Sequence, residues 1–297
     1  MSRNPAAFAF ALCCAAFAFS PPASSFIERV DDRGASVRLA APAARIVTLA
    51  PHLAEIVFAA GAGDKLVGTV LFSDYPPAAR DVPRVGDASR IDAERLLQLK
   101  PDLVLAWKSG NPAGDLLRLE RLRVPVFVTE PSRLADITRL MRTVGALAGT
   151  RAAADQAAAA FDADMAALRE RYSSRPAIRV FYEIWHRPLI TINGRHVISD
   201  VIELCGGVNV FAEARSLTPA VSLEAVLATG PRAIVGGGSG LHAQAFAAQW
   251  RSYSIRALRE MALVHVAPDV IQRATPRIAA GARAVCEGLE RIRRERP

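Results

Sequence analysis

A segment of 22 residues, 151–172, contains neither glycine nor proline and is dominated by alanine and other strong helix formers. Helix formers also fill the preceding stretch from residue 135, where only Gly145 and Gly149 interrupt them. A helix over residues 151–172 would be roughly 33 Å long at 1.5 Å per residue. A helix of that length between two folded regions acts as a rigid spine, so we expect the regions it joins to move by small angles only.

The residues before this helix alternate between short apolar runs and helix-forming runs. A hairpin is expected over residues 26–39, followed by buried strands at 45–50, 66–70, 103–107 and 124–128. Helices are expected between the strands at 54–60, 91–99 and 111–122, whereas prolines keep residues 73–77 extended. Alternation of this kind is typical of a parallel sheet covered by helices.

The same order returns after the long helix. Residues 178–184 predict a strand, 196–204 a helix and 233–235 another strand. In each half a helix-opening glutamate stands seven residues before a proline that precedes an apolar strand, Glu94 before Pro101 and Glu224 before Pro231. The fold class we predict is therefore α/β, with two related Rossmann-like lobes over residues 26–149 and 176–297, joined by a connecting helix over 150–175.

The first 25 residues have the character of a signal peptide. Arg3 is followed by an apolar run over residues 6–19 and then by small residues and prolines. The run is shorter than the roughly 20 residues that a membrane span requires. We therefore predict a signal peptide over residues 1–25 and an exported, periplasmic protein.

Two cysteines, Cys205 and Cys286, remain beyond that segment. An even pair in an exported chain is most simply a disulfide. Two buried free thiols are the alternative.

The charged residues do not point to a nucleic-acid partner. The chain carries 37 basic and 29 acidic residues, a formal net charge of +8. The basic residues are dispersed, apart from a short arginine-rich cluster at residues 291–294. Proteins that bind nucleic acid concentrate basic charge on one surface, so we expect no nucleic-acid partner.

No catalytic or metal-binding motif is visible. The segment 237–241 fails the G-x-S-x-G pattern at its last position, and no phosphate-binding loop occurs. The five histidines are scattered, without the spacing of a metal site. The sequence therefore favours a binding protein over an enzyme and predicts no metal site.

Three aromatic residues stand where ligands bind in parallel sheets. Tyr75 lies in the proline-rich loop, Trp107 ends an expected strand, and Trp185 follows another. Residues just beyond the carboxyl ends of parallel strands face the ligand crevice, and aromatic side chains there offer a large contact area. Packing into the core is the alternative for each, and the better interpretation for Trp250.

Five segments carry a resemblance to a known family. They are RIVTLAPHLAEI at 45–56, SDYPPA at 73–78, LKPDLVLAWKSGN at 99–111, ELCGGVNVF at 203–211 and RATPRI at 273–278. Together they resemble the vitamin B12-binding periplasmic proteins of ABC importers, within the wider group that binds siderophores, haem and cobalamin. The resemblance covers nearly the whole chain after residue 25.

The resemblance implies the helix-spined fold of class III periplasmic binding proteins, with cobalamin or a related corrinoid held in the cleft as transported ligand. Tyr75 and Trp107 would line the N-lobe wall, and Trp185, Asp269 and Arg273 the C-lobe wall. The family's cysteine pair matches Cys205 and Cys286. The resemblance implies no cofactor and no protein ligand to cobalt. The expected partner is an ABC permease, and we expect a monomer.

Two departures from the family keep other ligands open. Cleft tryptophans expected near residues 87–89 and 217–219 are missing. Haem, a ferric siderophore or a metal ion on the same fold is the alternative, with His52 or Tyr75 as an axial candidate for haem and His52 as a candidate metal ligand. An exported enzyme on this fold is the remaining class.

Glu94 and Glu224 are candidates for permease docking. Each follows a helix-capping residue by two positions, Asp92 and Ser222, and so lies in a first helical turn. The helix dipole favours an acid there by about 0.3–1 kcal/mol, which is the plain explanation. In the family resembled, glutamates at these matching places meet arginines of the permease.

Overall fold

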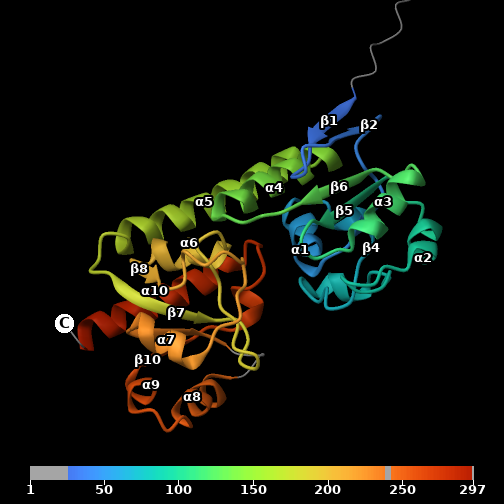
Figure 1. Cartoon of the computed structure of the whole chain (residues 1–297). Helices are drawn as coiled ribbons and strands as arrows, with labels where there is room; N and C mark the ends of the chain where they lie inside the picture. Colours follow the sequence, from blue (N-terminus) through green and yellow to red (C-terminus); the bar gives the residue numbers. More distant parts are fainter. Residues whose placement is uncertain (1–25, 238–241, 296–297) are drawn as a thin grey trace, which may run out of the picture.

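A computed structural model describes residues 26–237 and 242–295 (Figure 1). The predicted signal peptide, residues 1–25, lies outside them. The described chain opens with an antiparallel hairpin of β1 (Ile27–Val30) and β2 (Ser36–Leu39), as predicted. Gly34, with φ at 85°, forms its turn. No helix in the described ranges is long and apolar enough to cross a membrane.

The N-terminal lobe is built on a parallel sheet with strand order β4-β3-β5-β6. Its strands are β3 (Ile46–Thr48), β4 (Leu66–Gly68), β5 (Leu103–Trp107) and β6 (Val126–Thr129). Its helices are α1 (Pro51–Ala59), α2 (Ala93–Gln98) and α3 (Ala113–Arg121), with 3-10 turns η1 (Gly63–Lys65) and η2 (Pro77–Asp81). The first helix begins at Pro51, three residues before the predicted start, because proline is compatible with the first position of a helix.

The C-terminal lobe repeats this arrangement. Its parallel sheet has the order β10-β9-β7-β8. The strands are β7 (Ile178–Glu183), β8 (Gly207–Asn209), β9 (Ala233–Gly236) and β10 (Ala262–His265). The helices are α6 (Val197–Leu204), α7 (Leu223–Thr229), α8 (Ala243–Arg251), α9 (Arg256–Glu260) and α10 (Ile278–Glu295), with a 3-10 turn η3 (Pro268–Val270). Counted from each lobe's first strand, both sheets run second, first, third, fourth, which confirms the predicted α/β fold of two related lobes.

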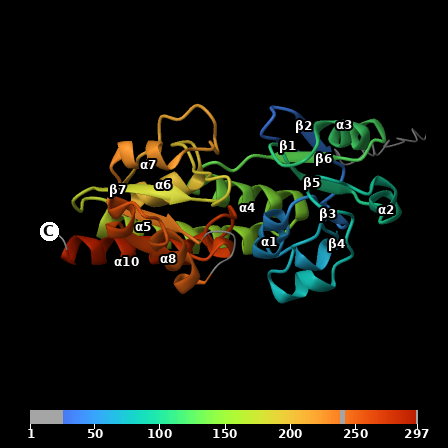
Figure 2. The ribbon, with the colours of Figure 1, turned by 60° about the horizontal axis from the view of Figure 1, so that its bottom comes forward.

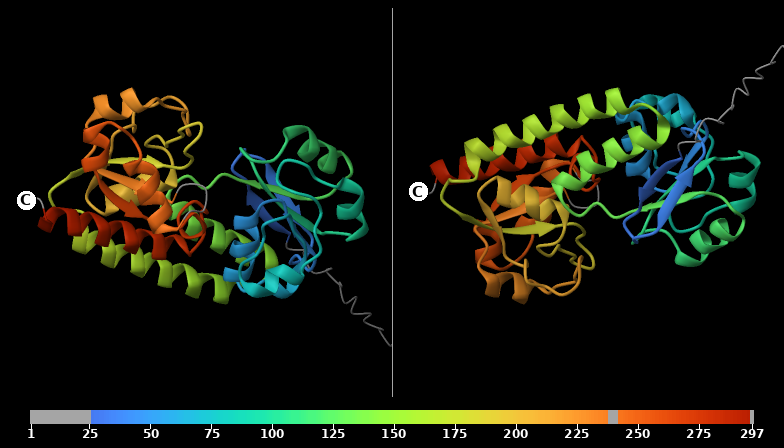
Figure 3. Two further views of the ribbon diagram at one scale, coloured as in Figure 1. Left: turned by 90° about the horizontal axis from the view of Figure 1, so that it is seen from below. Right: turned by 90° about the horizontal axis from the view of Figure 1, so that it is seen from above.

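The spine consists of two helices. α5 (Arg151–Tyr172) has the predicted bounds, and α4 (Leu134–Ala148) runs beside it as the other arm of a helical hairpin (Figures 1 and 3). Gly149 closes α4 in the left-handed conformation, with φ at 74°. A Cβ on Gly145 would lie 2.3 Å from the Cβ of Ala154, so this glycine lets the two helices approach closely.

The first helix of the spine contacts both lobes. The backbone NH of Leu134 donates to Asp200 of α6, 3.0 Å away, and α4 also packs against α1 and β1 of the N-terminal lobe. Residues 134–148, which the predicted boundary places in the N-terminal lobe, therefore join the lobes as α5 does. Figure 2 shows the lobes set at opposite ends of this pair of helices.

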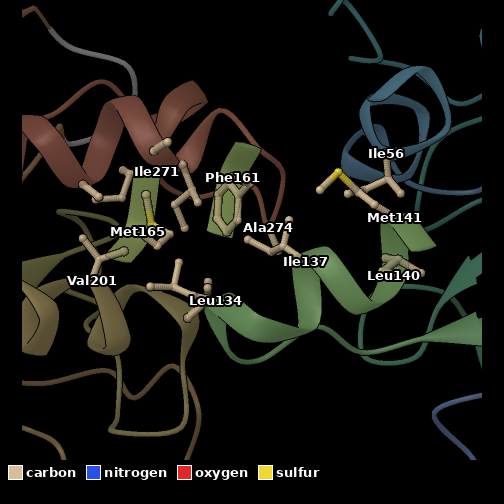
Figure 4. Close-up of a cluster of buried hydrophobic side chains, with 14 of the residues drawn as sticks. Ile56, Leu134, Ile137, Leu140, Met141, Phe161, Met165, Val201, Ile271 and Ala274 are labelled. Atoms are coloured by element: carbon tan, nitrogen blue, oxygen red, sulfur yellow. The ribbon is translucent and has the colours of Figure 1, made fainter. Parts of the chain in front are cut away.

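One apolar core runs along the spine and unites the lobes. Figure 4 shows Met141 of α4 beside Ile56 of α1 at one end, and Met165 of α5 near Val201 and Ile271 at the other. All five side chains are almost completely buried and belong to the same hydrophobic cluster. Because this core is continuous through α4 and α5, bending the spine would expose apolar surface. That cost favours small changes in the angle between the lobes.

Candidate binding cleft

The two lobes enclose a cavity of about 200 Å³ beside the spine. The N-terminal lobe contributes His52 of α1 and Trp107 at the end of β5, and the C-terminal lobe contributes His196, Leu217 and Arg273. Most of these residues follow strands or begin helices, the position where ligands bind in parallel α/β sheets. The predicted crevice between the lobes is therefore present.

Trp107 is held by the turn that follows it. Its backbone NH donates to the side chain of Asn111, 2.6 Å away, and the amide of Asn111 donates to the carbonyl groups of Leu49 and Ala88. A Cβ on Gly110 would lie 1.9 Å from the indole of Trp107, so the ring needs glycine at that position. Asn111 and Gly110 thus fix the ring in the cleft wall.

His52 packs edge-on against Trp107, with their ring centroids 5.2 Å apart. Burial and the nearby charge of Arg273 lower its pKa to about 4, so the imidazole is neutral at pH 7. Its Nε2 atom is buried and makes no hydrogen bond with any described residue. Neutral imidazole nitrogen is a ligand for haem iron and other transition metals. Within residues 26–237 and 242–295, no group of three or more His, Cys, Asp or Glu side chains is arranged to hold a metal ion.

Tyr75 lies in a second cavity, separate from that of Trp107. This cavity, of about 520 Å³, is also lined by Glu55 and Phe58 of α1 and by Arg277 of the other lobe. The guanidinium of Arg277 stands over the Tyr75 ring, 4.2 Å from its centroid. Two predicted residues of one cleft wall, Tyr75 and Trp107, thus face different cavities in this structure.

The three predicted residues of the C-lobe wall differ in their surroundings. Trp185 is 45% exposed, and its indole NH donates to the carbonyl of Arg187 at 2.9 Å. Asp269 is exposed and lies 3.8 Å from Arg273. Arg273 is largely buried and reaches across the cleft to Glu55 and Asp74, at 2.9 Å from each. Of the three, only Arg273 lines a cavity described above.

A buried polar cluster lies behind Trp185. Glu183 at the end of β7 is fully buried and accepts hydrogen bonds from the side chains of Gln249, at 3.0 Å, and Trp250. His186 lies 3.6 Å from the same carboxylate and 3.1 Å from the hydroxyl of Tyr253. Burial raises the pKa of Glu183 to about 7, despite the two hydrogen bonds that lower it. The turn that carries Trp185 is thus anchored at both ends by this cluster.

Phe72 is an exposed residue in contact with Arg273 that the sequence did not single out. Its side chain is 75% exposed and its backbone has φ at 66°, which is unusual for a residue with a bulky side chain. The backbone carbonyl accepts a hydrogen bond from Arg273 at 3.2 Å. The only signal in the sequence is its place beside the proline-rich loop of Tyr75, because neither its exposure nor its conformation follows from residue type.

The candidate docking residues lie where the capping pattern predicts. Asp92 accepts from the NH of Arg95 and Ser222 from that of Ala225, so each caps its helix. Glu94 and Glu224 stand exposed in the first turns of α2 and α7. A hydrogen bond with its own backbone NH and one with Ser222 lower the pKa of Glu224.

The predicted disulfide between Cys205 and Cys286 is present. Cys205 follows α6 and Cys286 lies in α10, so the bond ties two helices of the C-terminal lobe together.

Comparison with known proteins gives consistent matches. The family model described as periplasmic binding protein matches residues 46–269. The vitamin B12-binding protein of Vibrio parahaemolyticus is 34% identical over 255 residues, which cover 86% of this chain and 92% of that protein. The vitamin B12-binding protein of Vibrio cholerae is 36% identical over 251 residues, which cover 84% of this chain and 90% of that protein.

Solved structures of binding proteins are also similar to this chain. The crystal structure of the periplasmic vitamin B12-binding protein BtuF of Vibrio cholerae superposes with a TM-score of 0.75 at 35% identity, covering 85% of this chain and 98% of that one. The haem-binding protein RhuT of Roseiflexus superposes with a TM-score of 0.68 at 23% identity, covering 82% and 98%. At that identity the second likeness shows the fold alone.

Proposed function

This chain belongs to the periplasmic binding protein family, and on that premise we propose that it captures cobalamin, either vitamin B12 or a related corrinoid, and delivers it to an ABC permease. The observation that carries the proposal is the identity of 34% and more with vitamin B12-binding proteins over most of both chains. The two-lobe cleft is the site we assign to the ligand. Its role is binding and transport, without catalysis.

We assign ligand contact to Tyr75 and Trp107 on the N-lobe wall and to Trp185, Asp269 and Arg273 on the C-lobe wall. A corrinoid is a large, nearly neutral disc with apolar faces and an amide fringe, which flat aromatic side chains and a few polar groups suit. The fixed ring of Trp107 and the half-exposed rings of Tyr75 and Trp185 support this assignment.

Haem is the second candidate ligand, and the surroundings of His52 favour it. Its imidazole is neutral, buried at the cavity of Trp107 and free of a hydrogen-bond partner at Nε2 among the described residues. Such a nitrogen would supply one axial bond to iron.

We further infer how the protein reaches the periplasm and the permease. Residues 1–25 direct export to the periplasm and are removed. The mature protein acts as a monomer. Glu94 and Glu224 contact arginines of the permease from matching corners of the two lobes.

An absorption spectrum tests the ligand directly. The purified protein is mixed with cyanocobalamin, desalted and measured, and the same is done with haemin. Corrin bands retained at about one equivalent are the expected result. A retained Soret band without corrin bands would favour haem, and the loss of both ligands would contradict the proposal.

A further inference from the structure

Four charged side chains meet across the cleft, two from each lobe. Glu55 of α1 and Asp74 belong to the N-terminal lobe, whereas Arg273 and Arg277 belong to the C-terminal lobe. Arg273 lies 2.9 Å from both carboxylates, and Arg277 lies 3.3 Å from Glu55. These ion pairs connect residues about 200 positions apart in the sequence, and they join the two lobes directly.

The same cluster engages side chains that we assign to the ligand. Arg273 also donates to the carbonyl of Phe72, and Arg277 covers the ring of Tyr75. Arg273 and Tyr75 are therefore both occupied by contacts within the protein. Asp269 stays beside Arg273 in the same lobe, at 3.8 Å.

The cluster also forms a partition. Arg273 lines the cavity of Trp107, whereas Glu55 and Arg277 line the cavity of Tyr75. Because Arg273 of one cavity wall forms an ion pair with Glu55 of the other, this ion pair lies between the two cavities. The first space, about 200 Å³, is below the roughly 300–1,000 Å³ of ordinary small-molecule sites, and a corrinoid belongs at the upper end of that range. A ligand that touches both Trp107 and Tyr75 must displace the partition.

We propose that Glu55 and Asp74 set the affinity for the corrinoid by competing with it for Arg273. The inference rests on the proposed function. In the bridged arrangement the two carboxylates hold Arg273 and keep the cavities apart, and ligand binding requires that the bridge open.

The charges indicate the direction of the effect. A nearly neutral corrinoid offers amides to Arg273 and cannot replace two carboxylates charge for charge. The side chain of Glu55 is only 2% exposed, and its Oε2 atom has no hydrogen-bond partner in the described part of the chain. Burial raises the pKa of Asp74, but the hydrogen bond and charge of Arg273 outweigh it and lower the value. Opening the bridge therefore costs free energy that is subtracted from the ligand's binding energy.

The first test measures cobalamin affinity in Glu55→Gln with Asp74→Asn, which removes both charges and keeps the side-chain volumes. We expect binding roughly three- to thirtyfold tighter than in the wild type. Asp162→Asn is the matched control, since Asp162 is as exposed as Asp74 and pairs with Arg142 at 2.9 Å, but lines neither cavity. Asp74→Asn alone, at a half-exposed position, should fold normally and give a smaller gain. Unchanged or weaker binding in both charge-removing variants would overturn the proposal.

A second test does not depend on the ligand. Spin labels at Leu117→Cys and Ile255→Cys, exposed positions in α3 and before α9, report the distance between the lobes in protein without added ligand. When Glu55→Gln and Asp74→Asn are added to this labelled protein, the distances between the two labels should be longer and more broadly distributed than in the labelled protein that keeps Glu55 and Asp74. An identical distribution would contradict the bridge. If the distribution broadens but the wild type binds no cobalamin, the proposed function fails and the bridge stands.

Discussion

The two lobes have the same strand order but different chemistry at the end of the first strand. In the N-terminal lobe β3 ends at Thr48, whose hydroxyl lies 2.8 Å from that of Thr69, which in turn donates to Ser73. In the C-terminal lobe β7 ends at Glu183, a buried carboxyl with a pKa raised to about 7 by burial. The C-terminal lobe also holds the disulfide. The shared topology thus depends on the apolar strands and helices, and the residues at the ends of the strands can differ between the lobes.

Removing the disulfide should give the largest effect. In the chain-entropy model, a bond across a separation of 81 residues contributes about 4.5 kcal/mol to the free energy of unfolding. We expect Cys205→Ala with Cys286→Ala to lower the urea midpoint and melting temperature accordingly, and thiol titration of the unreduced wild type to find no free thiol among residues 26–295. Equal stability of the variant and the oxidised wild type would contradict a stabilising role.

Glu183 should make stability depend on pH. In the unfolded chain its pKa is near the ordinary 4.3, so as pH rises the unfolded state loses the proton first. The free energy of unfolding should therefore fall between about pH 4.5 and 7, by on the order of 3 kcal/mol from this group. Glu183→Gln should remove that fall when urea unfolding is followed across the range.

The matched substitution in the other lobe is Thr48→Val. It removes one neutral buried hydrogen bond and should cost about 1 kcal/mol independently of pH. Both variants keep His52 and His196, whose pKa values burial lowers from 6.5 to about 4. Because the unfolded chain takes up these protons first, both histidines destabilise the fold as the pH falls below 6.5, in both variants alike. If the free energy of unfolding of Glu183→Gln changed with pH in parallel with that of the wild type, Glu183 would not be the source of the pH dependence. This carboxyl would then not make the C-terminal lobe differ from the N-terminal lobe.

The two tryptophans test whether both walls hold the ligand. Trp107→Ala and Trp185→Ala should each weaken cobalamin binding by about 1–3 kcal/mol, through lost aromatic contact. Isothermal titration measures the effect, with Leu117→Ala, an exposed residue of α3, as control. Intact affinity in both tryptophan variants would remove them from the site, and a loss in only one would place the ligand on a single lobe.

The docking residues should give the smallest effect on the protein itself. Glu94→Arg with Glu224→Arg loses a favourable interaction with the helix dipole at each exposed site and, at Glu224, the hydrogen bonds with its own backbone NH and with Ser222. Cobalamin affinity should be unchanged, while association with the permease and vitamin uptake should fall. Normal uptake at physiological salt would leave the dipole as a sufficient explanation for both glutamates.

Much of the fold could be predicted because its signals are local. The period of apolar residues locates the strands, the absence of glycine and proline defines α5, and capping residues place Glu94 and Glu224. The two-arm form of the spine cannot be predicted, since whether Gly149 ends a helix or only interrupts it depends on how α4 packs against α5.

The cleft could be predicted only in part. Trp107 follows from its place at a strand end, but the pairing of Arg273 with Glu55 joins residues more than 200 positions apart and has no local signal. The same holds for the cluster of Glu183 with Trp250 and His186, which forms only when α8 packs against the sheet.

A crystal structure of the complex with cyanocobalamin tests most directly whether the two lobes hold the ligand together. We predict corrin density between the lobes, in contact with Trp107 and Trp185, with the guanidinium of Arg273 withdrawn from Glu55 and Asp74. Density on one lobe only, or on a surface outside the cleft, would contradict this account.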